Sequence, residues 1–223
     1  MSPNDQALQQ LDERPDTPET REKGLDGWLD AIIYYGLGQH MLLALPTLWI
    51  AFQTVSIPVA VTTSAIVSLT VASVTIGAFR MGVLSTGHPW HRIEDNELGL
   101  GPDGGYGFLV RRAAYLNTTL GLATFAGAIA DASGWGLVGA VLVGGGFSFG
   151  ALYVLPNLRA ANSKQSVPVR VIYYAVSLSV VASTGQVLEL SVGAPSAALA
   201  FAVVCLFTVF DVGADLRKPM DGM

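Results

Sequence analysis

Three groups of residues in this 223-residue sequence have side chains that could do chemistry. Gln39 and His40 stand side by side in an apolar segment, Ser148 is the centre of the pentapeptide GFSFG, and His88 and His91 precede several acids. Imidazole, hydroxyl and carboxylate groups serve in proton transfer, nucleophilic attack and metal binding. Each group also has a purely structural interpretation, which depends on the elements that carry it.

His40 follows Asp30 by ten residues, which in a helix that enters a bilayer at Asp30 places it about 15 Å deep. An ionisable group at that depth faces the bundle interior and marks a pathway or ligand site, or else it packs as a neutral, hydrogen-bonded imidazole. Ser148 reaches a similar depth, counted back from Arg159. We therefore predict a midplane polar site of Gln39, His40 and Ser148, provided that their helices are neighbours.

Ser148 also completes a formal G-x-S-x-G motif, which raises the possibility of a serine hydrolase. That motif belongs on a strand-to-helix turn of a soluble sheet. Intramembrane serine proteases of the rhomboid kind instead use a histidine of their sixth helix, and the last apolar segment here has none. The sequence also lacks H-E-x-x-H, a P-loop and a lysine within an apolar segment. An intramembrane hydrolase is therefore the weakest alternative, and no catalytic residue and no cofactor are predicted.

Metal binding is not predicted either. His88 and His91, with nearby acids, offer metal ligands in the connection 81–110, but H-x-x-H beside a proline is more typical of a turn with exposed imidazoles. The single cysteine, Cys205, excludes a disulfide within the chain and a cysteine cluster. Its apolar surroundings predict a packed residue.

The composition is that of a membrane protein. Charged residues make up 13% of the chain and the mean hydropathy is +0.48. The net charge of −5 excludes a nucleic-acid partner, because phosphate binding needs a basic face. Acidic residues outnumber basic ones by 17 to 12. An acidic protein surface stays hydrated at high salt, so we expect a halophilic archaeon as the source.

The charges divide the chain into apolar segments. Outside residues 1–30, 80–112, 159–170 and 215–223 there are only three charged residues: Asp131, Glu189 and Asp211. The stretch 31–79 has none and is long enough to cross a bilayer twice, so it predicts a helical hairpin with its turn at 53–58. The same reasoning gives further breaks at Asp131–Gly134 and at Glu189. We predict an all-α, six-transmembrane-helix bundle of three hairpins, 30–80, 111–159 and 170–217.

The connections predict domain limits and orientation. Residues 1–27 predict a disordered acidic tail, 28–218 the transmembrane domain with a loop at 81–110, and 219–223 a short C-terminal tail. All twelve Lys and Arg residues fall in the tails and in the two connections that follow the second and fourth helices. By the positive-inside rule, the chain is a multi-pass protein of the cell membrane with both termini cytoplasmic. Asp211 is expected to pair with Arg217 or to reach water at the inner surface.

The hairpins resemble one another. Val110–Arg111 with Tyr115 and Val169–Arg170 with Tyr174 open the second and third hairpins at the same spacing, and Tyr34–Tyr35 lies at the matching place in the first. One interpretation is a threefold internal repeat. The other is that tyrosine and snorkelling arginine belong at any inner membrane interface.

The fourth predicted helix is the richest in glycine. Gly146 and Gly150 have the small-xxx-small spacing that brings helices together in lipid, so this helix is predicted to be the central helix, with Gly146 against a neighbouring backbone, or a self-association face. Two function classes remain. One is a small-solute or ion transporter or channel, and the other is a non-catalytic structural or accessory subunit, whose partners are the lipid bilayer and another membrane protein or a second copy through helix 4.

Overall fold

The structure is a computed structural model, and it describes residues 24–84, 105–161, 166–187 and 195–216. Throughout this part of the chain every regular element is a helix, so the all-α fold is confirmed. The predicted disordered tail, most of the 81–110 loop and the break at Glu189 lie outside the described residues.

The first helical stretch is built from short pieces that follow one another: α2 (Leu25–Asp30), η1 (Ala31–Gly38), α3 (Gln39–Leu43) and α4 (Leu45–Gln53). η1 has π-helical turns. Between α3 and α4 the backbone leaves the helical region at Ala44, with φ −99° and ψ 13°. Pro46 follows in the first turn of α4, where its missing N–H costs least.

α5 (Pro58–Arg80) begins at the proline that the sequence marks as the end of the turn. It runs antiparallel to the first stretch. A Cβ on Gly36 would overlap the backbone of Ser73, and a Cβ on Gly77 would lie 2.7 Å from the Ile32 side chain. Glycine at these positions lets the two helices approach closely, which is how apolar helices associate in lipid.

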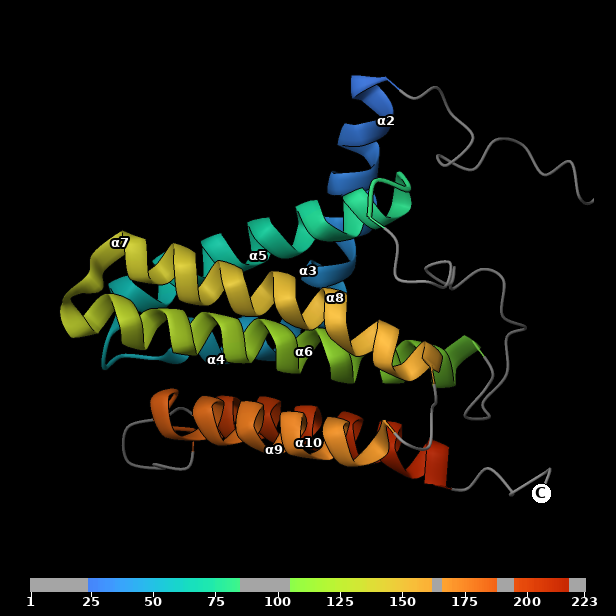
Figure 1. The fold of residues 1–223 in the computed structure, drawn as a ribbon. Coiled ribbons are helices and arrows are strands. Elements are labelled where there is room, and N and C mark those ends of the chain that lie inside the picture. The colour runs from blue at the N-terminus through green and yellow to red at the C-terminus, as the bar shows by residue number, and fades with distance from the viewer. Residues whose placement is uncertain (1–23, 85–104, 162–165, 188–194, 217–223) are drawn as a thin grey trace, which may run out of the picture.

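The second hairpin turns on glycine. α6 (Gly105–Ala130) passes through η2 (Asp131–Trp135) and α7 (Gly136–Gly139) into η3 (Ala140–Gly145) and α8 (Gly146–Ala161). Gly134 has φ +95° and Gly136 φ +56°, a region that glycine adopts without strain. Figure 1 shows α6 and α8 lying antiparallel on either side of this turn. The reversal falls at the break that the sequence predicts.

The third pair is α9 (Val167–Thr184) and α10 (Pro195–Leu216). Contacts between their side chains pair Arg170 with Asp215 and Tyr174 with Asp211, so the two helices are antiparallel. In Figure 1 they lie together on one side of α6, with α5 and α8 on the other.

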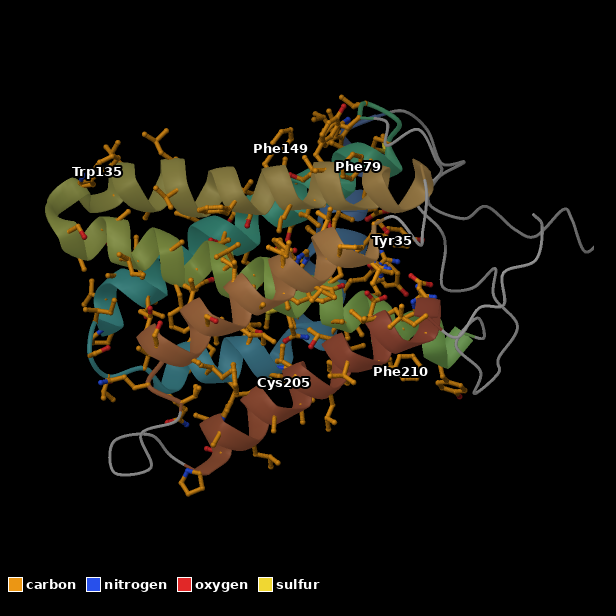
Figure 2. The ribbon with its side chains drawn as sticks, turned by 60° about the horizontal axis from the view of Figure 1, so that its bottom comes forward. Tyr35, Phe79, Trp135, Phe149, Cys205 and Phe210 are labelled. Atoms are coloured by element: carbon orange, nitrogen blue, oxygen red, sulfur yellow. The ribbon has the colours of Figure 1, made fainter. Side chains whose placement is uncertain are left out.

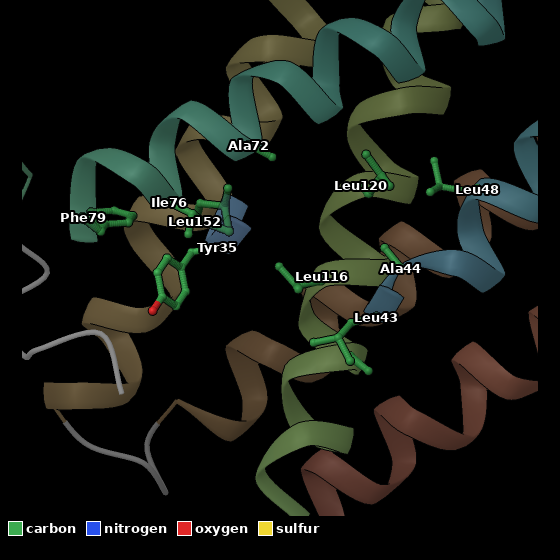
Figure 3. Packing of buried hydrophobic residues seen from close by; sticks show 11 residues of the cluster. Tyr35, Leu43, Ala44, Leu48, Ala72, Ile76, Phe79, Leu116, Leu120 and Leu152 are labelled. Carbon is green, nitrogen blue, oxygen red and sulfur yellow. The ribbon is translucent and has the colours of Figure 1, made fainter. Parts of the chain in front are cut away.

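The central helix is α6, and the prediction that the glycine-rich fourth helix takes this place is wrong. α6 packs against α4, α5, η3, α8, α9 and α10. Leu116, Leu120, Ala123 and Phe125 of α6 are each no more than 1% exposed. Around them lie two apolar clusters, one of which is drawn in Figure 3 and includes Tyr35, Leu43, Ile76 and Leu152. Small and branched side chains along α6 allow helices to pack on all its sides.

Four helices are long and apolar enough to cross a membrane: Pro58–Phe79, Leu109–Val154, Val167–Thr184 and Pro195–Leu216. The second of these contains the reversal at Gly134, so its two arms lie antiparallel. The interrupted stretch from Leu25 to Gln53 is not among the four. Large apolar side chains on the outer surface, such as Leu199 and Leu206, suit a lipid environment.

Candidate functional site

A buried cluster of four charges joins three helices at one end of the bundle. Arg111 comes from α6, Arg170 from α9, and Asp211 and Asp215 from α10. Their side chains are between 1% and 4% exposed. In Figure 2 the neighbouring Phe210 marks the level of the cluster near the end of α10.

Each arginine bridges both carboxylates. Arg111 donates from Nε to Asp211 Oδ1 at 3.0 Å and from Nη2 to Asp215 Oδ1 at 2.6 Å. Arg170 donates from Nη1 to Asp211 Oδ2 and from Nη2 to Asp215 Oδ2, both at 2.5 Å. The rigid fork of a guanidinium suits such paired contacts. All four carboxylate oxygens therefore accept a charged hydrogen bond.

Helical spacing aligns the members of the cluster. Asp211 and Asp215 are four residues apart and share one face of α10, as Arg170 and Tyr174 share one face of α9. The Tyr174 hydroxyl donates to Asp211 Oδ2 at 2.8 Å. The four described charges sum to zero, so removing one of them would leave a buried charge without its counterpart, which is costly.

Of the two predictions for Asp211, contact with water is contradicted by this geometry, whereas pairing with Arg217 stays a prediction. Asp211 is 1% exposed and is held by Arg111, Arg170 and Tyr174. Arg217 lies outside the described residues. Nor do Arg111 and Arg170 snorkel to a surface, because bonds to α10 hold them inside the bundle.

A second polar centre lies at Asn117 on α6, opposite the break in the first stretch. Its Nδ2 donates to Leu43 O at 2.7 Å and Ala113 O at 2.8 Å. Its Oδ1 accepts from the Thr47 N–H at 3.1 Å and the Thr47 hydroxyl at 2.8 Å. Leu43 O and Thr47 N–H would bond each other in an unbroken helix, so Asn117 satisfies the two groups that the break separates.

The structure shows the surroundings of each residue of the predicted midplane site. His40 is fully buried, and its Nδ1 lies 2.8 Å from Gly36 O, while its Nε2 has no hydrogen-bond partner among the described residues. Gln39, beside it, is partly buried, and its Oε1 has no partner in the same part of the chain. Ser148 is fully buried and donates to Ser68 O of α5 at 3.0 Å. The observed contacts thus tie His40 to its own helix and Ser148 to α5, and none joins the two, so their shared site stays a prediction.

The packing role of Gly146 within the chain is corrected. A Cβ on Gly146 or on Gly150 would meet nothing within 4 Å among the described residues, and Gly146 is exposed. Other glycines of this segment do pack closely: Gly144 against α5 and Ala123 O of α6, Gly145 against Val71 of α5, and Gly139 against Trp135 and Ala130. Rotation of the helix decides which glycines face inward. The predicted self-association face at Gly146 and Gly150 therefore points away from the chain's own helices.

The remaining residues that could bind a metal are His88, His91 and Cys205. His88 and His91 lie outside it, and the described residues contain no group of three or more His, Cys, Asp or Glu side chains placed to hold a metal ion. Cys205 is a partly buried free thiol on α10, visible in Figure 2.

The charge cluster was not predicted as a site, although its signals are in the sequence. The repeated Val–Arg pair at Arg111 and Arg170 and the i, i+4 spacing of Asp211 and Asp215 are both visible there. The sequence could not show that the two arginines face the same helix.

The fold and the buried cluster define an all-helical protein whose long apolar helices are compatible with a membrane location. The chain belongs to the family described as "Domain of unknown function (DUF8215)", which matches residues 22–162. No curated protein and no solved structure matches the chain. The matched region ends one residue after α8, so α9 and α10, with three of the four clustered charges, lie beyond it.

Proposed function

We propose that the protein is a multi-pass protein of the cell membrane that serves as a non-catalytic structural or accessory subunit. The observation that carries the proposal is that two polar centres of the described interior, Asn117 and the charge cluster, bond to the chain itself. Asn117 uses both ends of its amide on α6 and the first stretch, and the charge cluster saturates its own carboxylates. A transport site would instead leave such groups available to water or solute.

Six crossings with both termini cytoplasmic are part of this proposal. The antiparallel arms of the α6–α8 hairpin and the packing of the first stretch along α5 support the count. The orientation rests on the twelve basic residues, which all belong to the tails and two connections.

The internal repeat remains part of the proposal for the second and third hairpins. Arg111 and Arg170 occupy equivalent positions in these hairpins and bind the same two carboxylates, Arg111 at the two Oδ1 atoms and Arg170 at the two Oδ2 atoms. Two hairpins derived from one ancestor would bring equivalent side chains to a shared centre in this way.

The subunit proposal is tested by the mass of the protein extracted from its native membrane in mild detergent. We expect a particle heavier than the 23.4 kDa chain, containing a second copy or a second protein. Gly146→Leu should reduce the particle to the single chain without altering its unfolding, because Gly146 points outward. Ala202→Leu, a similar change at an exposed position of α10, is the control and should leave the particle intact. A wild-type particle with the mass of one chain would contradict the proposal.

A small-solute or ion transporter is the second candidate, and one observation favours it. His40 Nε2 and Gln39 Oε1 are buried without hydrogen-bond partners among the described residues, as groups reserved for a ligand would be. An imidazole can bind and release a proton, so proton flux is the first assay. Vesicles with the wild-type protein should discharge a pH gradient faster than protein-free vesicles, and His40→Ala should abolish the difference. Equal rates for wild-type and protein-free vesicles would count against the transporter.

A further inference from the structure

Two parts of the chain meet at the charge cluster, and they carry opposite buried charges. The N-terminal unit, residues 24–84 and 105–161, contributes Arg111 to the cluster. The C-terminal hairpin, α9 and α10, contributes Arg170, Asp211 and Asp215, a net charge of −1. Arg111 brings the sum of these four described charges to zero. The two surfaces are therefore electrostatically complementary.

Polar contacts and a close glycine contact also join the two parts. Ser177 of α9 donates to Thr118 O, and the Tyr173 hydroxyl donates to Thr119 Oγ1 at 3.0 Å. Further along both helices, a Cβ on Gly121 of α6 would lie 2.7 Å from the Val181 side chain of α9. In lipid, helices are held together by such hydrogen bonds and close contacts, because lipid tails are as apolar as the side chains.

The contact extends to the opposite end of the hairpin. Gly185 follows α9 and lies against Ile50 and Phe125 of the N-terminal unit, and a Cβ there would lie 3.0 Å from Ile50. Val181 and Ala197 belong to the same buried cluster as Ile50 and Phe125. The interface thus has a charged centre at one end and a close-packed apolar region at the other.

The family match ends in the sequence where the first of the two interacting parts ends. The matched residues 22–162 comprise the N-terminal unit, whereas α9 and α10 lie outside the match. Within that unit, Arg111 is a buried cation whose observed carboxylate partners both lie on α10. A cation on a lipid-exposed helix face is expensive, so the unit gains by binding an acidic helix there.

We propose that the C-terminal hairpin is a docking module, and that α6 around Arg111 is a docking surface for a helical hairpin that presents two carboxylates four residues apart. The module binds the N-terminal unit through non-covalent contacts strong enough to persist when the α8–α9 connection is cut. This inference concerns how the chain assembles, so it holds or fails independently of the subunit and transporter proposals.

The test uses the full chain, with a protease site inserted at residues 162–165 and an affinity tag on the N-terminus. The protein is inserted intact into the membrane, extracted in mild detergent, cleaved, and bound to the affinity resin. The C-terminal fragment should stay with the tagged fragment. Its loss into the wash from the wild-type protein would overturn the proposal.

Charge variants test the role of the cluster. Arg111→Gln and Asp215→Asn each leave one unbalanced buried charge, and each should release the fragment roughly tenfold faster or more. The double variant restores neutrality and should release it more slowly than either single variant, a coupling that independent sites would not show. Asp131→Asn, at the far turn, is the control and should behave as wild type.

Variants that do not accumulate are also informative. If Arg111→Gln is degraded before extraction and the double variant accumulates, charge balance at the docking surface is supported. Equal retention of the fragment in all variants, or no recovery in the double variant, would overturn the electrostatic basis of docking.

Discussion

Replacing Asn117 by leucine should destabilise the protein, because the Asn117 amide bonds the two backbone groups that are left unpaired at the break in the first helical stretch. The change keeps a similar volume but removes the bonds to Leu43 O, Thr47 N–H and Ala113 O. Leu43 O and Thr47 N–H would then be buried without their partner, whereas the Thr47 hydroxyl keeps a second acceptor, Asn117 O, at 3.2 Å. The loss of stability is therefore the cost of burying two backbone groups without a hydrogen-bond partner.

The size of the effect follows from those two groups. An orphaned buried backbone group costs roughly 1–3 kcal/mol, which gives a loss of roughly 2–6 kcal/mol in the free energy of unfolding. Interhelical hydrogen bonds in membranes average about 0.6 kcal/mol, and this places the expected value near the lower end of that range. The apolar leucine side chain offsets part of the loss.

The assay is equilibrium unfolding of the purified protein in mixed micelles by increasing SDS, followed by circular dichroism. Thr124→Val is the matched control, since Thr124 is buried on the same helix and its hydroxyl has no hydrogen-bond partner among the described residues. That variant should be neutral or slightly more stable. An Asn117→Leu protein that unfolds at the same SDS fraction as Thr124→Val would refute the reasoning.

Three other predictions concern helix packing, a buried hydrogen bond and membrane orientation. Gly36→Ala should lower stability by about 1–3 kcal/mol in the same assay, because the new methyl group meets the backbone of α5, whereas Gly146→Ala should be neutral because that site is open; similar losses would contradict the packing. Tyr174→Phe should cost about 1.5–3 kcal/mol through loss of its bond to a carboxylate of α10, and an unchanged unfolding curve would show that the bond contributes nothing. In a variant without the native cysteine, a new cysteine at Ser133 should react with an impermeant maleimide from outside intact cells, and one within residues 85–104 should not; the reverse pattern would refute the orientation.

Local features of the sequence determined much of this fold. Charge-free segments longer than a bilayer crossing predict apolar helices, since no charged side chain can lie in lipid without cost. Pro58 and Gly134 predict where the chain turns, because proline begins a helix without losing a hydrogen bond and glycine adopts positive φ. These properties depend on a residue and its near neighbours along the chain.

The tertiary structure decided which helix is central, which glycines pack, and which charges meet. Gly144 and Gly146 are two residues apart, yet one lies against α5 and α6 and the other faces outward, because a helix turns by about 100° per residue. Arg111 binds carboxylates on α10 that are 100 and 104 residues away in sequence. A repeated Val–Arg pair cannot reveal such partners, since they depend on how each helix is rotated about its axis. That rotation is set by the packing of all the helices together.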